Sequence, residues 1–227
     1  MLRKVIITLS FSLILTSITA VAKAEWIKDQ KNKWVYYKND SSKLNYNVTE
    51  NYIEPIKLPQ YYQADDRWGV KRYGLSNMKL TGCVPTALAM AISGLKEDVN
   101  PVQVADFLYD MTMELNTTFL GTSSLGVQEV VSQWGLNYKV IDSKEELEKT
   151  LKSGTLVYGA VGHGIFVNGY STHAVLLTGY ENGKTKAFDP DNMAKTNKWY
   201  NIDDIWKERS LAPEDNMTGG AFIAIYK

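Results

Sequence analysis

The 227-residue sequence has a single cysteine, Cys83, and two histidines, His163 and His173. One cysteine excludes an intramolecular disulfide and a zinc site built on cysteine pairs, and two histidines argue against a multi-histidine metal site. An excess of positive charge is also missing, because 25 Lys and Arg residues stand against 25 Asp and Glu residues. This balance gives no reason to expect a nucleic-acid partner, and any nucleophilic chemistry has few residues to use.

Long apolar runs are absent after the N-terminal stretch 5–20. At about 16 residues, that run is shorter than the roughly 20 needed to span a bilayer. Arg3 and Lys4 precede it, and the cleavage signal Ala22-Lys23-Ala24 follows it. The pattern predicts a cleaved signal peptide at residues 1–24. We therefore expect a secreted, extracellular protein of a Gram-positive-type bacterium, without stable membrane insertion after cleavage.

Residues 25–57 form a polar, aromatic N-terminal arm with few aliphatic side chains. Such a composition does not build a core of its own. The segments 26–29 and 33–37 resemble one cell-wall-binding repeat of the choline-binding type, although these repeats bury their faces by stacking on neighbours. The alternative is an arm that packs its aromatic residues on the core domain.

Residues 58–227 are predicted to form one α+β domain, in which helices come first and an antiparallel sheet follows. The helices are expected near 85–94, 100–111, 124–134 and 143–154, where Pro, Asn and Ser stand at the starts and Gly at several ends. The strands are expected at 138–141, 156–161, 174–180, 186–188 and 220–226, with a further helix near 202–207.

Cys83 precedes the helix that Pro85 opens, so its thiol is expected at a helix N-terminus. The helix dipole favours a negatively charged thiolate there, and Gly82 lets the backbone turn tightly and leaves room for a substrate. A thiolate in this position is the nucleophile of a cysteine hydrolase. The alternative is a small buried core residue, because free cysteine is among the most buried residue types.

His173 and Asp189 stand at matching ends of a predicted hairpin that turns at Asn182-Gly183. Each arm has about eight residues, so the two side chains are expected to be neighbours at one edge of the sheet. A catalytic cysteine needs an imidazole that takes and returns protons, and a third group that orients the imidazole. His163, between two glycines, is the rival base, for which we favour a substrate-side role or none.

Gln63 is a candidate oxyanion-hole donor, since a side-chain amide stabilises the charge of a tetrahedral intermediate. Without Cys83 downstream, a surface glutamine would be the better interpretation. The stretch 121–126, rich in Gly and Ser, is predicted from its composition to be a loop beside the cleft.

The order of these motifs resembles the papain-like cysteine peptidases, and more narrowly the exported single-domain relatives of the peptidases that process bacteriocin leaders at a double glycine. The matching motifs are Tyr61, Gln63, Asp65 and Trp68, the box Gly82-Cys83-Val84-Pro85-Thr86, His173-Ala174-Val175, Gly179-Tyr180 and Asp189-Pro190. The resemblance implies that Cys83 is the nucleophile and His173 the general base and acid. It likewise implies Asp189 as the orienting group and Gln63 as the oxyanion donor.

Two departures from the family pattern concern Val84, where relatives often carry glycine, and the long spacing between Gln63 and Cys83. The expected function is a secreted cysteine peptidase that cleaves a peptide or protein substrate through an acyl-enzyme. The alternatives are a cell-wall peptide hydrolase or transferase with the same triad, and a non-catalytic peptide-binding module. None of these functions requires a metal or a cofactor.

Overall fold

The computed structural model describes residues 25–28, 34–37, 52–115, 121–169 and 171–227. The chain divides into two compact units, Met1–Val48 and Thr49–Lys227. In the first unit, strand β1 (Glu25–Lys28) pairs antiparallel with β2 (Trp34–Tyr37). The predicted signal peptide and most of the predicted arm lie outside the described residues. Within those residues, no helix has both the length and the apolar character needed to cross a bilayer.

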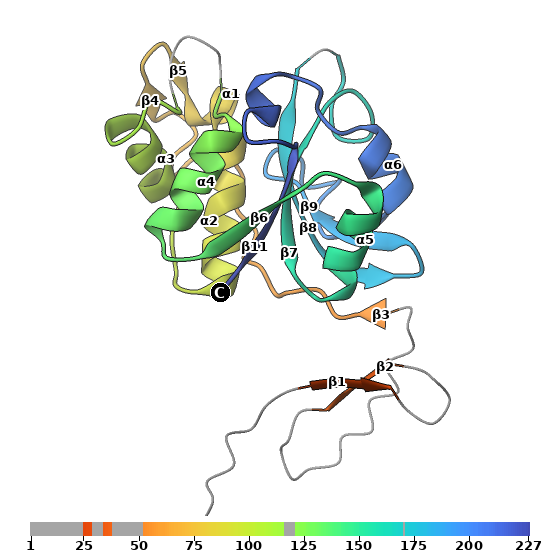
Figure 1. The fold of residues 1–227 in the computed structure, drawn as a ribbon. Coiled ribbons are helices and arrows are strands. Elements are labelled where there is room, and N and C mark those ends of the chain that lie inside the picture. Colours follow the sequence, from red (N-terminus) through yellow and green to blue (C-terminus); the bar gives the residue numbers. More distant parts are fainter. Residues whose placement is uncertain (1–24, 29–33, 38–51, 116–120, 170) are drawn as a thin grey trace, which may run out of the picture. The chain divides into compact units, whose positions relative to one another are not determined.

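The second unit is built on one antiparallel sheet, as the sequence predicts (Figure 1). In spatial order its strands are β10 (Lys198–Asn201), β9 (Lys184–Phe188), β8 (His173–Glu181), β7 (Leu156–Val161), β11 (Phe222–Tyr226) and β6 (Asn137–Ile141). A short strand, β3 (Tyr52–Ile53), also pairs with β8, so the sheet of this unit includes a strand that precedes residue 58. The C-terminal strand β11 lies inside the sheet, between β7 and β6.

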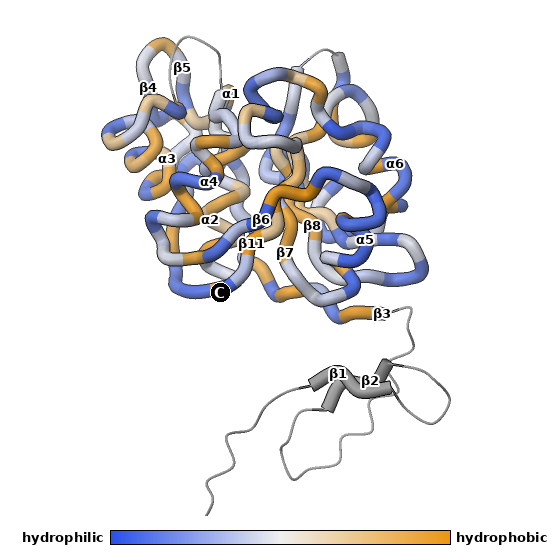
Figure 2. Tube along the Cα trace, in the orientation of Figure 1, coloured by the Kyte–Doolittle hydropathy of each residue, from blue (hydrophilic) through white to orange (hydrophobic). Residues whose placement is uncertain are grey.

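Helices cover both faces of this sheet (Figure 1). One face carries α2 (Cys83–Leu95), α3 (Pro101–Asp110) and α4 (Ser124–Gln133), and the other carries α5 (Lys144–Lys152) and α6 (Ile202–Lys207). Strand β7 shows the reason, because alternate side chains of a strand point to opposite faces. Tyr158 and Ala160 join the core of the α2 face, and Val157 and Val161 join the other core. Accordingly, apolar residues dominate the central strands (Figure 2).

Helix α2 is the most deeply buried helix of the α2 face, and every residue from Val84 to Ile92 is buried. Three alanines in this run, Ala87, Ala89 and Ala91, keep its surface narrow. The helix continues through Gly94, where a helix end is predicted, and stops at Leu95. A Cβ at Gly94 would lie 2.3 Å from Leu58 Cδ2. Glycine at this position therefore serves close packing rather than helix termination.

Short elements that the sequence pattern misses lie at the end of the unit where α2 begins. They are β4 (Arg72–Tyr73), β5 (Ser76–Asn77), α1 (Met78–Thr81) and the 3₁₀ helix η1 (Glu214–Asn216). Each is too short to show a hydrophobic period. They matter because α1 and η1 both contribute to the pocket described below.

Helix α3 begins with a complete capping box. Asn100 Oδ1 accepts hydrogen bonds from the backbone N–H groups of Val102 (3.0 Å) and Gln103 (3.1 Å), and Gln103 Oε1 accepts one from Asn100 N (2.9 Å). These bonds satisfy donors that have no partner inside the helix. The structure thus confirms the helix start predicted at Asn100-Pro101.

Replacing Asn100 with alanine is expected to lower the free energy of unfolding by about 1 kcal/mol, because the exposed side chain contributes a cap and no core packing. Chemical denaturation monitored by circular dichroism measures the loss. Asn100→Asp keeps the acceptor and should stay close to the wild type. Equal losses in both variants would contradict the capping role.

Candidate active site

Cys83 is the first residue of α2, and Gly82 is both the C-cap of α1 and the N-cap of α2. The two helices meet so closely that a Cβ on Gly82 would lie 2.3 Å from the Met78 carbonyl oxygen. This close approach explains the glycine and fixes the position of the thiol. The first-turn N–H groups of a helix have no intrahelical acceptor, so the partly buried Cys83 faces an electropositive helix end.

The hairpin β8–β9 brings His173 and Asp189 together. Asn182 and Gly183 at its turn both have positive φ, of 48° and 80°, as a two-residue hairpin turn requires. Leu176 pairs with Phe188, so the chain returns to the end of the sheet where β8 begins. His173 Nε2 lies 2.8 Å from Asp189 Oδ1.

Asp189 is held by a network around one carboxylate oxygen. Besides His173, Oδ1 accepts the backbone N–H groups of Asp191 (2.8 Å) and Asn192 (3.1 Å). The backbone N–H of Asp189 donates to Thr196 Oγ1 at 3.1 Å. With its side chain only 1% exposed, the carboxylate cannot reorient freely and therefore fixes the plane and tautomer of the imidazole.

The contact with Asp189 uses Nε2 of His173, which leaves Nδ1 for the hydrogen bond to Cys83. Burial by itself lowers the pKa of His173. The hydrogen bonds to Asp189 and Cys83, and the negative charges of both groups, outweigh burial and raise this pKa to about 10. His173 is therefore protonated at neutral pH and can stabilise a thiolate on Cys83, the ion pair from which a cysteine nucleophile acts.

Gln63 is buried and connects the two halves of the site. Its backbone N–H donates to the Pro190 carbonyl (2.8 Å), next to Asp189. Its Nε2 donates to the Lys79 carbonyl of α1 (2.8 Å). An amide nitrogen carries two hydrogens, so a second donor remains for a substrate. Oε1 is buried and has no hydrogen-bond partner among the described residues.

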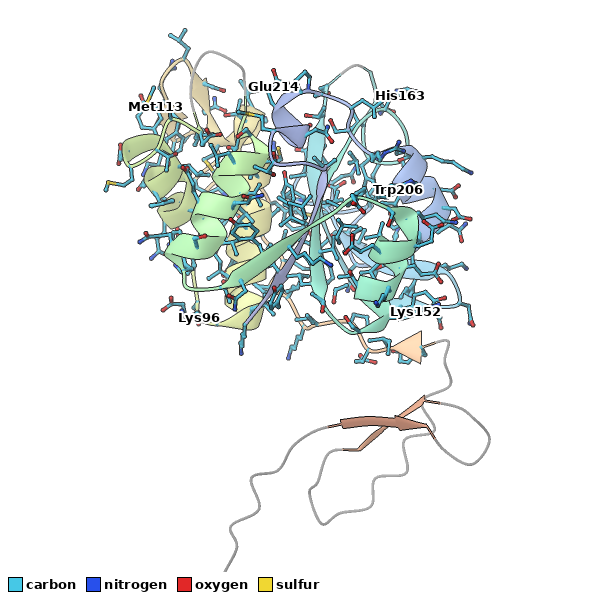
Figure 3. All side chains as sticks on the ribbon, viewed as in Figure 1. Lys96, Met113, Lys152, His163, Trp206 and Glu214 are labelled. Carbon is cyan, nitrogen blue, oxygen red and sulfur yellow. The ribbon has the colours of Figure 1, made fainter. Side chains whose placement is uncertain are left out.

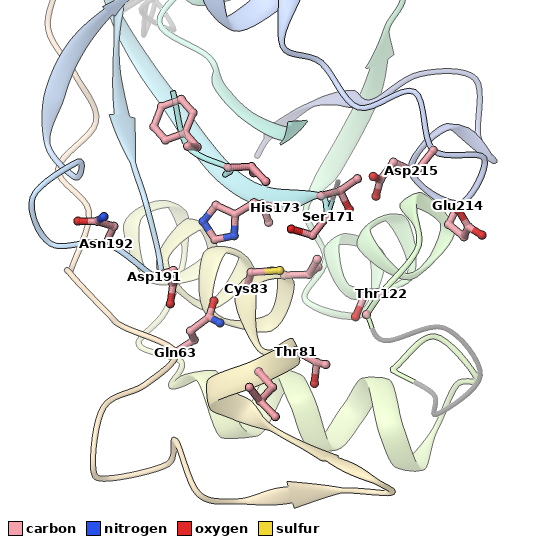
Figure 4. A pocket seen from close by; sticks show the side chains of 18 of the residues that line it. Gln63, Thr81, Cys83, Thr122, Ser171, His173, Asp191, Asn192, Glu214 and Asp215 are labelled. Carbon is pink, nitrogen blue, oxygen red and sulfur yellow. The ribbon is translucent and has the colours of Figure 1, made fainter. Parts of the chain in front are cut away.

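A pocket of about 690 Å³ joins these groups, with Cys83, His173 and Gln63 in its lining. Figure 4 shows His173 and Gln63 on one side of Cys83 and a polar wall on the other. The sequence pattern does not predict this second wall, except that Gly121 and Thr122 of the loop predicted at 121–126 line the pocket; from Ser124 on, that stretch belongs to α4 instead. The side chains of the wall are Thr122, Tyr158, Ser171, Thr172, Glu214 and Asp215.

The rival base, His163, does not line the pocket. It lies in the exposed loop after β7, where its Nδ1 accepts the backbone N–H of Gly169 at 3.3 Å. Figure 3 shows His163 and Glu214 at the same end of the unit. In the part of the chain that the structure describes, no three His, Cys, Asp or Glu side chains are grouped to hold a metal ion.

Comparisons with known proteins place this architecture among peptidases. The model of the Peptidase_C39 like family matches residues 55–214. No curated protein matches the chain. A crystal structure named as a C39-like peptidase from Bacillus anthracis has 17% identity and a TM-score of 0.52, over 77% of this chain and 98% of that one.

Two further solved structures are similar at lower TM-scores. A double glycine motif protease from an AMS/PCAT transporter, in complex with the leader peptide, has 19% identity and a TM-score of 0.45, over 77% of this chain and 96% of that one. The peptidase domain of Streptococcus ComA has 18% identity and a TM-score of 0.45, over 64% and 89% of the two chains. The family and the B. anthracis fold confirm the predicted α+β, papain-like architecture.

The raised pKa of His173 predicts a specific titration. Its Cε1–H NMR signal should stay constant between pH 6 and 8.5 and move near pH 10, and His163→Gln assigns it by leaving one histidine. Because the folded protein holds this proton above the ordinary pKa of 6.5, the stabilisation is fully present below pH 6.5 and is lost as the pH rises through about 10.

Asp189→Asn is the matched variant for this titration, because it keeps the size of the side chain and removes its charge. The midpoint of the His173 titration should fall in this variant. A wild-type midpoint near 6.5 would show that the imidazole does not hold its proton as the geometry indicates.

Proposed function

The chain belongs to the Peptidase_C39-like family, and on that premise we propose that it is an active cysteine peptidase. The observation that carries this proposal is the buried His173–Asp189 contact beside Cys83, with the pKa of His173 raised to about 10. The proposed substrate is a peptide bond of a peptide or protein that enters the pocket next to the thiol. We also propose, from the N-terminal sequence, that the protein acts after export from the cell.

Acylation begins with the Cys83 thiolate. Its sulfur forms a bond to the substrate carbonyl carbon, and the carbonyl π electrons move to the oxygen. The free N–H of Gln63 Nε2 stabilises that oxyanion. When the carbonyl forms again, the C–N bond breaks, and the leaving nitrogen takes a proton from His173 Nδ1. The products are a free amine and a thioester on Cys83.

Deacylation reverses the direction of the proton. A water molecule gives a proton to Nδ1 of His173 as its oxygen attacks the thioester carbon. The C–S bond then breaks, the carboxylic acid leaves, and the thiolate–imidazolium pair is restored. Asp189 takes no proton in either step; it keeps Nε2 of His173 occupied, so that Nδ1 always faces the sulfur.

Cleavage of a diverse fluorogenic peptide library by the purified protein tests the proposal. Cys83→Ala should abolish turnover, and His173→Ala should lower kcat/KM by at least about a thousandfold. Alkylation by iodoacetamide reads one site, because Cys83 is the only cysteine, and should be slowed strongly in His173→Ala. Fast alkylation without cleavage of any peptide would instead favour the binding module with an assembled but unused triad.

Gln63→Ala separates oxyanion stabilisation from activation of the thiol. Peptide hydrolysis should fall by about 10²–10³-fold, as for other single oxyanion donors. Alkylation of Cys83 by iodoacetamide forms no oxyanion, so its rate should change less than about twofold under the same principle. A parallel loss of both rates would mean that Gln63 supports the geometry of the thiol rather than the intermediate.

A further inference from the structure

The pocket wall across Cys83 from His173 carries two neighbouring acids, Glu214 and Asp215 of η1. Asp215 is only 7% exposed. Among the ion pairs of the described residues, none involves either acid. The one lysine of the pocket, Lys195, donates instead to the Phe166 carbonyl at 3.3 Å. Two carboxyl groups therefore face the pocket without a cation.

Asp215 is positioned by hydroxyl groups. Ser210 Oγ donates to Asp215 Oδ2 at 2.5 Å, and Thr172 also donates to this carboxylate. Burial raises the pKa of Asp215, and these two hydrogen bonds lower it only in part, while the charge of Glu214 raises it further. A buried carboxylate is normally paired with a cation or fully hydrogen-bonded. A positively charged group bound beside Asp215 and Glu214 would therefore interact favourably with both carboxyl groups.

Thr122 gives an independent indication of a ligand on the same wall. Its side chain is 5% exposed and lines the pocket. Its hydroxyl is buried and has no hydrogen-bond partner among the described residues. An unpaired buried hydroxyl costs free energy, and a bound group that donates a hydrogen bond would remove this cost. Figure 4 shows Thr122 below Glu214 and Asp215, beside the same cavity.

Tyr158 connects this wall to the reacting sulfur. The side chain is buried, and its phenol interacts electrostatically with both Cys83 and Asp215. Burial, with these two negative groups, raises the pKa of Tyr158 well above its ordinary value. The phenol is thus a neutral group in the lining of the pocket that also holds Cys83 and the two acids.

The direction of the chemistry decides which part of the substrate meets this wall. The leaving nitrogen receives its proton from His173, so the leaving side of the substrate lies at His173. Figure 4 places Asp215 and Glu214 on the opposite side of Cys83. The wall therefore faces the acyl part of the substrate, which stays attached to the sulfur after the bond is broken.

We infer that Asp215, Glu214 and Thr122 form a subsite for a positively charged side chain, lysine or arginine, on the acyl side of the cleaved bond. The inference rests on the proposed peptidase function. An ammonium or guanidinium group supplies only donors, and the wall supplies two carboxylates and an unpaired hydroxyl. Charge-assisted hydrogen bonds of this kind are among the strongest in proteins.

Binding to the inactive Cys83→Ala protein tests the subsite without turnover. Fluorescently labelled peptide pools are made with lysine, norleucine or glutamate at one of the three positions on the acyl side of a fixed central peptide bond, one position per pool. Fluorescence anisotropy gives the Kd of each pool. Norleucine keeps the lysine stem and lacks the charge. At one position we expect the lysine pool to bind about tenfold more tightly than the norleucine pool.

Substitutions in the wall should remove this preference. Asp215→Asn keeps an acceptor for Ser210, and Glu214→Gln changes a partly exposed side chain, so at least the second should fold normally. Each should bring the lysine and norleucine pools within about threefold of each other, and Glu214→Lys should favour the glutamate pool. Thr122→Val should weaken only the lysine pool. Asp98→Asn, which removes an exposed carboxylate in the turn after α2, is the matched control and should change nothing.

The outcomes separate this subsite from the proposed function. Peptide cleavage by wild-type protein without a lysine or arginine preference at any of the three positions would overturn the subsite and leave the peptidase intact. A lysine preference in binding that the wall variants abolish, without cleavage by the wild type, would support the subsite and overturn the peptidase. A preference that survives Glu214→Gln and Asp215→Asn would assign it elsewhere and overturn the subsite.

Discussion

The hydrogen bond between His173 Nε2 and Asp189 Oδ1 is the interaction on which the geometry of the site depends. It joins the two ends of one hairpin, so the register of β8 and β9 and the positive φ angles at Asn182 and Gly183 determine whether it forms. The segment that follows β9 also positions Gln63, because the carbonyl of Pro190, next to Asp189, accepts the backbone N–H of Gln63. One end of the hairpin thereby positions the proposed base, the proposed orienting group and the proposed oxyanion donor.

The proposed nucleophile reaches this cluster from a different layer of the fold. Cys83 belongs to α2, which packs on the sheet through small residues, and the hydrogen bond to His173 forms where that helix begins. The distance between sulfur and imidazole is thus set by the packing of the core on the α2 face and by the tight junction at Gly82. Cores are densely packed and resist small changes of volume. A substitution in this core is therefore expected to change the distance between the Cys83 sulfur and the His173 imidazole.

Sequence reasoning finds the parts of the site that have local signals. Pro85 marks the helix after Cys83, and Asn182-Gly183 fixes the hairpin that joins His173 to Asp189; both elements are confirmed by the structure. The helix end predicted at Gly94 is wrong, because this glycine is required for close packing against Leu58, and the sequence alone does not distinguish such a glycine from one that ends a helix. The acidic wall is assembled from segments near 122, 158, 172 and 214, and no short pattern connects positions so far apart. The cleavage after residue 24 and the export of the protein stay predictions.

The two sides of the pocket around Cys83 differ in charge. On the His173 side, Cys83 lies beside an imidazole whose pKa is raised, and the contact with Asp189 orients that imidazole. On the Asp215 side, neither of the two acids forms an ion pair among the described residues, and the neutral Tyr158 interacts electrostatically with both Asp215 and Cys83. Negative charge near a thiolate disfavours its formation. If the wall is a subsite for lysine or arginine, the cationic side chain cancels that charge as it binds. Recognition of the substrate and the reactivity of the sulfur would then be coupled through one electrostatic field, and a neutral side chain bound at the same place would leave the nucleophile weaker.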